Sequence, residues 1–102
     1  MRGPEKKIQL AIIDMLNARG WTVKETHGNM YQQGLPDLYC IHPEHKQRWV
    51  EVKNPKRYKF TAAQLQFFPI LNKCVGLWIL VAASDVEYKK LFLPPNWYHY
   101  LK

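Results

Sequence analysis

Residues 48–53, Arg-Trp-Val-Glu-Val-Lys, constrain the fold more than any other part of this sequence. Side chains alternate across a β-strand, so Trp49, Glu51 and Lys53 lie on one face of the predicted strand, whereas Arg48 and both valines lie on the other. The valine face suits a core, but a carboxylate and an ammonium are costly to bury unless they are paired or bind a metal ion. The pattern therefore indicates either a solvated edge strand with a surface Glu51–Lys53 ion pair or a strand that carries a charged site.

Hydrophobic periodicity and turn signals place this strand in an order that mixes helices and strands. A helix at residues 4–19 precedes strands at 21–27, 38–42 and 48–53, with a polar loop at 28–34. A second helix begins at Thr61 and ends before Gly76, and it is followed by a strand at 77–82 and a short helix at 84–92. We expect the α/β class, with a small mixed β-sheet flanked by helices in a single domain that spans residues 1–102.

Local signals refine the later elements. Residues 61–64 and 84–87 match the capping box, in which a Ser or Thr and a Glu or Gln three residues later cap a helix start. Pro69 lies inside the second predicted helix, where its missing N–H is expected to kink or shorten the helix. The aromatic tail at residues 96–102 is predicted either to form an interface between subunits or to fold back onto its own sheet.

Charge and residue usage narrow the class of partner. The 15 Lys and Arg residues against 8 Asp and Glu residues give a net charge of +7, which favours a polyanion such as nucleic acid or an acidic membrane surface. Cys40 and Cys74 lie in apolar segments and are predicted to be buried, reduced thiols. His42 and His45 flank a turn and are a weak candidate pair for zinc. Nothing resembles a signal peptide or a membrane span, so we expect the cytoplasm of a bacterium or a phage-infected host cell.

Asp37, at the start of the predicted strand 38–42, adds a second carboxylate to the charged site. This strand and the one that carries Glu51 are predicted to form a hairpin, which brings the two carboxylates together. Adjacent carboxylates repel unless a cation neutralises them, and oxygen ligands of this kind suit Mg²⁺ or Mn²⁺. Such a metal activates water for phosphodiester hydrolysis, and Lys53 is suited to orient or deprotonate that water or to neutralise the phosphate.

Three motifs occur in order along the chain: Gly-Leu-Pro-Asp-Leu at residues 34–38, Trp-Val-Glu-Val-Lys-Asn-Pro at 49–55, and Phe-Thr-Ala-Ala-Gln at 60–64. Together they resemble the virus-type replication-repair nuclease domain (VRR-NUC), a branch of the PD-(D/E)xK nuclease superfamily, and in particular its stand-alone viral form. The resemblance runs from about residue 5 to residue 84. It implies a restriction-endonuclease-like fold with an αβββαβ core.

The resemblance also implies roles for individual residues. Asp37 and Glu51 would hold the metal ion together with the backbone carbonyl of Val52, Lys53 would be catalytic, and Gln64 would support the catalytic site. Gln64 is equally well explained as the return half of a capping box with the residue at the helix start. One side chain is not expected to serve both purposes at once.

Two further groups have competing explanations. Glu5 matches an acidic metal-binding residue in the first helix of the family, but an acidic residue in a first turn is also favoured by the helix dipole. The basic loop after the charged strand is predicted to contact DNA, because cations beside an aromatic ring suit phosphate contacts and stacking. Its residues are Lys56, Arg57, Tyr58 and Lys59. The alternative is an ordinary solvated loop.

The sequence therefore predicts a Mg²⁺- or Mn²⁺-dependent DNA endonuclease. The family resemblance favours branched DNA, Holliday (four-way) junctions in particular, and a homodimer would supply the two opposed cuts that a junction requires. One alternative is a nuclease directed to flaps or nicks, and another is a non-catalytic DNA-binding module of the same fold. The intact set of Asp37, Glu51 and Lys53 argues against the non-catalytic module.

Overall fold

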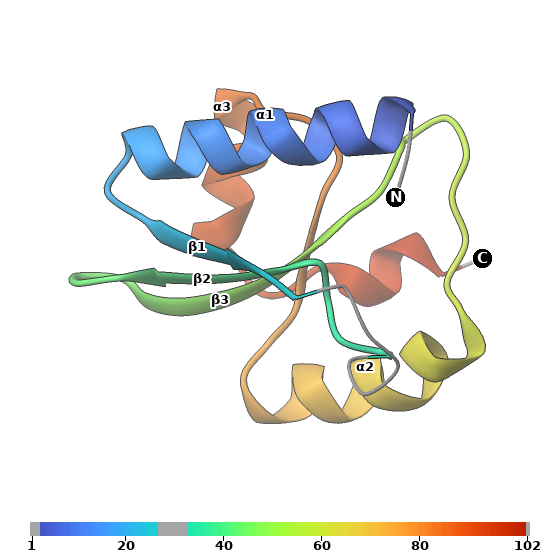
Figure 1. Cartoon of the computed structure of the whole chain (residues 1–102). Helices are drawn as coiled ribbons and strands as arrows, with labels where there is room; N and C mark the ends of the chain where they lie inside the picture. Colours follow the sequence, from blue (N-terminus) through green and yellow to red (C-terminus); the bar gives the residue numbers. More distant parts are fainter. Residues whose placement is uncertain (1–2, 27–32, 102) are drawn as a thin grey trace.

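A mixed β-sheet with helices on both faces forms the framework of the protein (Figure 1). The computed structural model describes residues 3–26 and 33–101. Within these ranges the sheet has four strands in the order β1-β2-β3-β4, which are β1 (Thr22–Glu25), β2 (Leu38–His42), β3 (Lys46–Val52) and β4 (Trp78–Leu80). The pairs β1–β2 and β2–β3 are antiparallel and β4 is parallel to β3, so the predicted α/β class with a mixed sheet is confirmed.

The helical elements of the described ranges are α1 (Pro4–Ala18), α2 (Ala62–Cys74), α3 (Asp85–Lys89) and the short 3₁₀ turns η2 (Lys90–Phe92) and η3 (Trp97–Tyr100). Helix α1 lies over one face of the sheet and α2 over the other (Figure 1). Helix α2 connects β3 to β4, because parallel neighbours need a long crossover. Among the described helices, none combines the length and the apolar character needed to cross a membrane.

Each face of the sheet is covered by its own apolar cluster, because side chains alternate along a strand. On the α1 side, Leu16 packs in one cluster with Val50 and Val52 of β3. On the α2 side, Phe68 packs in a second cluster with Ile79 of β4. The valines of β3 therefore occupy one face only, as the alternation in the sequence predicted.

Strand boundaries differ from the predicted ones at three places. Strand β1 was predicted at residues 21–27 and is observed at Thr22–Glu25, with Trp21 in the core just before it. His27 and most of the predicted loop at 28–34 lie outside the described residues. Strand β3 is longer than predicted and begins at Lys46, whose φ of 71° closes a tight turn after β2. Strand β4 is shorter than residues 77–82, but it is buried over its whole length, as expected.

Helix α2 begins with the predicted capping box. The Thr61 hydroxyl accepts from the Gln64 N–H at 3.1 Å, and Gln64 Oε1 accepts from the Thr61 N–H at 3.0 Å. Pro69 is exposed inside this helix, and the helix continues beyond it to Cys74. Of the two effects expected of Pro69, shortening of the helix is therefore wrong, and the kink stays a prediction. Phe68 and Leu71, on either side of the proline, both pack into the core and hold the helix there.

At α3 the second predicted capping box is only half formed. Ser84 Oγ accepts from the Glu87 N–H at 3.2 Å, as expected. The Glu87 carboxylate does not return to the start of the helix: it accepts from the Val81 N–H at 3.0 Å and lies 2.6 Å from Lys90 Nζ. Glu87 therefore links α3 to the end of β4.

The aromatic tail folds back onto its own sheet, which was one of the two predicted arrangements. Trp97 is 4% exposed and packs edge to face against Phe60 and Phe68. Before it, Asn96 Oδ1 accepts from the Ile79 N–H at 2.7 Å and Asn96 Nδ2 donates to the Ile79 carbonyl at 3.2 Å. The Asn96 amide thus satisfies the outer edge of β4 in the way that a neighbouring strand would.

The two cysteines differ in burial. Cys40 is fully buried, and burial raises the pKa of its thiol to about 12. Cys74 is exposed in the last turn of α2, so the prediction that it is buried is wrong. The apolar sequence around Cys74 is misleading because α2 buries only the side that carries Phe68 and Leu71.

Candidate active site

Asp37 and Glu51 lie side by side at one end of the sheet. The strand register pairs Leu38 with Val50, so Asp37 lies opposite Glu51. The Asp37 N–H donates to Glu51 Oε1 at 3.1 Å, and the Val52 N–H donates to Asp37 Oδ2 at 2.8 Å. Because each carboxylate accepts a hydrogen bond from the other strand, the hairpin holds the two acidic side chains together.

The chain that enters β2 is held in place from two sides. Beyond the end of β1, the Thr26 N–H donates to the Asp37 carbonyl at 3.0 Å, and the Thr26 hydroxyl donates to the Pro36 carbonyl. From the α2 side, Gly34 has a φ of 87°, and a Cβ there would lie 3.0 Å from the Ala63 carbonyl oxygen. Glycine lets this loop pack directly on the first turn of α2, which brings Asp37 and that turn to the same end of the sheet.

Lys53, immediately after β3, forms a buried ion pair with Glu51. Its Nζ lies 2.9 Å from Glu51 Oε2 and donates to the Lys59 carbonyl at 2.9 Å, and it lies 4.7 Å from the centre of the Phe60 ring. Glu51 is 2% exposed and Lys53 is 6% exposed. The interpretation of these two residues as a surface ion pair on an edge strand is therefore wrong.

Two carboxylates, those of Asp37 and Glu51, share a neighbouring ammonium, that of Lys53. Burial and the neighbouring Asp37 carboxylate raise the pKa of Glu51 to about 8, although the Lys53 ammonium acts in the opposite direction. A divalent cation bound between two such carboxylates relieves their repulsion. The donor set, which is two carboxylates beside a strand backbone, therefore fits a hard cation such as Mg²⁺ or Mn²⁺.

Gln64 takes part in both of the arrangements that the sequence presented as alternatives. Its Oε1 accepts from the Thr61 N–H in the capping box, while its Nε2 donates to Glu51 Oε2 at 3.0 Å. The expectation that one residue would not serve both purposes is wrong, because the amide carries its acceptor and its donor on separate atoms. The cap fixes the Gln64 side chain, and that side chain in turn orients the Glu51 carboxylate.

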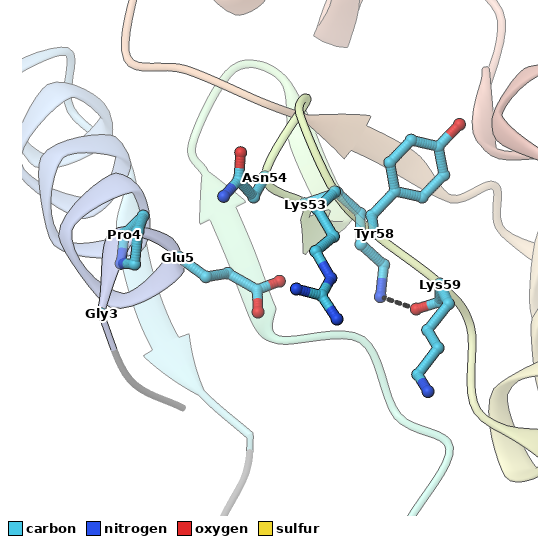
Figure 2. Close-up of a pocket in the computed structure, with 8 residues that line it drawn as sticks. Gly3, Pro4, Glu5, Lys53, Asn54, Tyr58 and Lys59 are labelled. Atoms are coloured by element: carbon cyan, nitrogen blue, oxygen red, sulfur yellow. Dashed lines mark hydrogen bonds between the residues drawn. The ribbon is translucent and has the colours of Figure 1, made fainter.

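A cleft of about 850 Å³ opens beside Lys53, between the start of α1 and the loop after β3. Figure 2 shows Glu5 reaching from α1 into this cleft, on the side where Lys53 lies. Burial raises the pKa of Glu5, Lys53 lowers it and Asp37 raises it, with a net upward shift. The structure thus brings Glu5 within electrostatic reach of Asp37 and Lys53.

The loop after β3 forms the opposite wall of the cleft. Three of the four residues predicted to contact DNA, Arg57, Tyr58 and Lys59, line it. Lys56 is exposed in the same loop but is not among the lining residues, and its N–H donates to Asn54 Oδ1 at 3.0 Å. Asn54 also lines the cleft and was missed by sequence reasoning, although its position directly after the charged strand was an available signal.

His42 and His45 form a separate cluster with Glu44 at the β2–β3 hairpin. Ligand atoms of His42, Glu44 and His45 lie within 4.8 Å of one another. His42 Nδ1 accepts from the Glu44 N–H at 3.0 Å and His42 Nε2 lies 3.2 Å from the Arg19 carbonyl, so both ring nitrogens already have partners. The cluster therefore fits zinc less well than the paired carboxylates fit a hard cation.

Comparisons with known proteins give a result at the level of the fold. No family model matches the sequence, and no curated protein matches it. A solved structure described as a VRR_NUC domain is similar to this chain, with a TM-score of 0.68, 23% sequence identity, and coverage of 83% of this chain and 91% of that structure. The chain has the fold of a VRR_NUC domain, so the fold implied by the motif resemblance is confirmed.

Proposed function

We propose that this protein is a metal-dependent nuclease that hydrolyses phosphodiester bonds in DNA. The observation that carries the proposal is the buried pair of Glu51 and Lys53 with the half-buried Asp37 carboxylate beside it, at the point where Lys53 lines an open cleft. A core gains nothing from two carboxylates and an ammonium in this position, whereas phosphodiester hydrolysis uses all three. The VRR_NUC fold and the net charge of +7 are consistent with this activity and with a polyanionic substrate.

Asp37 and Glu51 would hold Mg²⁺ or Mn²⁺, with the Val52 carbonyl and Glu5 as further candidate ligands. The support is the raised pKa of Glu51 and the upward influence of Asp37 on the pKa of Glu5. When bound, the ion would supply activation of a water molecule and neutralisation of charge on the scissile phosphate. The Val52 N–H bond to Asp37 keeps the strand backbone next to the carboxylates.

The remaining residues would bind the DNA backbone, orient the Glu51 carboxylate and neutralise charge on the phosphate. Lys53 would place its ammonium beside the reacting phosphate, where it stabilises negative charge that develops in the transition state. Gln64 would keep Glu51 in a single orientation through its 3.0 Å hydrogen bond. Arg57 and Lys59, on the opposite wall of the cleft, would contact the DNA backbone and fix its position without reading its sequence.

The experiment that tests the proposal offers labelled four-way junction, flap, splayed-arm and linear duplex DNA to the purified protein. We expect cleavage with Mg²⁺, no cleavage with excess chelator, and at least a roughly 100-fold loss of rate in Glu51→Gln. The matched control is Glu44→Gln, which changes an exposed glutamate at the hairpin and should leave the rate unchanged. Full cleavage in excess chelator would refute the metal site.

Branched DNA as the preferred substrate, and a homodimer as the active unit, belong to the same proposal. The described residues provide one carboxylate pair and hence one cut per chain, whereas a four-way junction needs two opposed cuts, which a two-fold dimer supplies. Light scattering at micromolar concentration tests the dimer. A mass near 12.1 kDa for the free protein, together with a complex that contains a single protein chain per junction DNA, would contradict it and favour flap substrates instead.

A further inference from the structure

A second, smaller pocket lies next to the catalytic cleft. Its volume is about 290 Å³, near the lower end of the range of roughly 300–1,000 Å³ that is typical of small-ligand sites. Its lining is mostly aromatic and aliphatic, with one charged side chain, and consists of Tyr58, Lys59, Phe60, Leu65, Tyr100 and Leu101. The pocket therefore suits one small, flat, mainly apolar group that is attached to something negatively charged.

Three aromatic rings give the pocket its shape. The ring of Tyr58 meets Phe60 at 6.1 Å and Tyr100 at 5.8 Å between centroids, with interplanar angles of 75° and 66°. All three side chains are half-buried, so each packs against the protein on one side and keeps exposed surface that a ligand can contact. Phe60 is fixed from behind by Phe68 and Trp97 of the core. Preformed aromatic surfaces of this kind are the usual platforms for stacking an unpaired base.

The pocket is continuous with the catalytic cleft. Tyr58 and Lys59 line both. Phe60 lines the pocket, and its ring lies 4.7 Å from Lys53 Nζ. Lys53 also donates to the Lys59 carbonyl, which Figure 2 marks with a dashed line. A group in the pocket would therefore be separated from the candidate catalytic lysine by little more than one aromatic ring.

We propose that this pocket binds the base of an unpaired nucleotide adjacent to the scissile phosphate. The inference rests on the proposed nuclease function and names its substrate class, which is DNA with at least one unpaired nucleotide next to the cut. The covalent distance from a phosphate to its own base is short, and the cleft and the pocket share a wall. In an intact duplex the bases are stacked inside the helix, so only an unpaired or extruded base reaches such a pocket.

An abasic-site scan tests the proposal. Branched DNAs that carry a single abasic site at successive positions around the branch point are titrated with the protein in excess chelator, and binding is followed by fluorescence anisotropy. We expect one position at which loss of the base weakens binding about 10-fold, within the roughly 5- to 150-fold range for one stacked base. Tyr58→Leu should abolish this preference, because it keeps an apolar side chain but removes the aromatic ring.

The matched control is Tyr98→Leu, which makes the same change at a tyrosine that is 53% exposed and does not line the pocket. It should keep the preference. Leu65→Gln, at an exposed wall position on α2, provides a second pocket variant should Tyr58→Leu fail to fold. An equal effect of abasic sites at all positions, or an unchanged preference in both pocket variants, would overturn the proposal.

Cleavage assays on the same DNAs with Mg²⁺ separate the two ideas. Cleavage without any base preference would support the proposed nuclease function and contradict the proposed role of the pocket in binding a base. A base preference at one position, lost in Tyr58→Leu but unaccompanied by cleavage of any DNA, would support the pocket as a binding site and contradict the nuclease. Cleavage that slows only when the base at the sensitive position is absent or paired supports both.

Discussion

On one face of β3, Val50 and Val52 have no exposed surface. On the other face Glu51 is 2% exposed, and Lys53, which continues this face directly after the strand, is 6% exposed. Burial of an aliphatic side chain stabilises a protein by about 1.5–3 kcal/mol, whereas burial of an ion costs several kcal/mol before any pairing is counted. The two faces of one strand are thus equally hidden from water and have opposite effects on stability. We attribute the charged face to function, because the fold alone would be better served by apolar residues there.

A second Glu–Lys pair, with a buried glutamate and a half-buried lysine, shows that a buried glutamate beside a lysine does not mark a site by itself. Glu87 is 7% exposed and lies 2.6 Å from Lys90, but it accepts from the Val81 N–H and serves to join α3 to β4. Glu51 differs because Asp37 adds a second carboxylate and raises its pKa further. The comparison indicates that the crowding of like charges, more than burial, identifies the candidate active site.

The largest expected effect on cleavage comes from removing the Lys53 ammonium from the charged face. Lys53→Met keeps the side-chain stem against Phe60 and removes the ammonium, so single-turnover cleavage should fall by about 10²- to 10⁴-fold. Lys73→Met, in the exposed last turn of α2 and outside the cleft lining, is the control and should cleave at a near-normal rate. A rate for Lys53→Met within roughly tenfold of the original protein would contradict the assigned role.

On the apolar face, a substitution is expected to have a smaller effect, which lowers stability and leaves the cleavage rate unchanged. Val50→Ala should lower the free energy of unfolding by about 2 kcal/mol, because it loses buried apolar area and leaves a small cavity. Urea unfolding measures this, and cleavage per folded molecule should not change. Val86→Ala, at a residue that is 70% exposed, is the control and should change stability by less than about 0.5 kcal/mol. A loss of cleavage in folded Val50→Ala would contradict the assignment of stability to the apolar face and of cleavage to the charged face.

The division between the faces of β3 was predictable because it depends on spacing within one strand. The capping box at Thr61 was predictable for the same reason, since both of its partners lie within four consecutive residues. The motif resemblance implied that Gln64 supports the site, but local patterns did not predict its bond to Glu51, because that bond joins side chains 13 residues apart in the sequence. Its geometry depends on how α2 packs on the sheet, which local patterns do not encode.

The tail shows the same limit in a different form. Its aromatic residues indicated an apolar contact, but their spacing did not distinguish an interface from the protein's own core. Asn96 settles the position of the chain by bonding to both backbone groups of Ile79, and an asparagine after two prolines carries no sequence signal for that role. The pocket formed by Tyr58, Phe60 and Tyr100 escaped prediction because it joins two segments that meet only in three dimensions.

The smallest expected effect tests whether the charged face is strained in the absence of metal. The Glu51 carboxyl has an ordinary pKa of 4.5, and burial together with Asp37 raises it to about 8 in the folded protein. The folded state therefore holds this proton more tightly than the unfolded state does. The resulting stabilisation is complete below the unfolded pKa, and it is lost as the pH rises through the folded pKa.

In excess chelator, the protein should thus be less stable at about pH 8.5 than at about pH 5.5, and Glu51→Gln should reduce that difference by at least about 1 kcal/mol, the equivalent of one pKa unit. Urea unfolding of both proteins at both pH values measures the effect, and groups other than Glu51 largely cancel in the comparison. Added Mg²⁺ should restore stability at the higher pH in the original protein but much less in Glu51→Gln, since the variant lacks one of the two carboxylates. If both proteins showed the same pH dependence, the Glu51–Lys53 pair would be self-sufficient, and the charged face would need no cation to be stable.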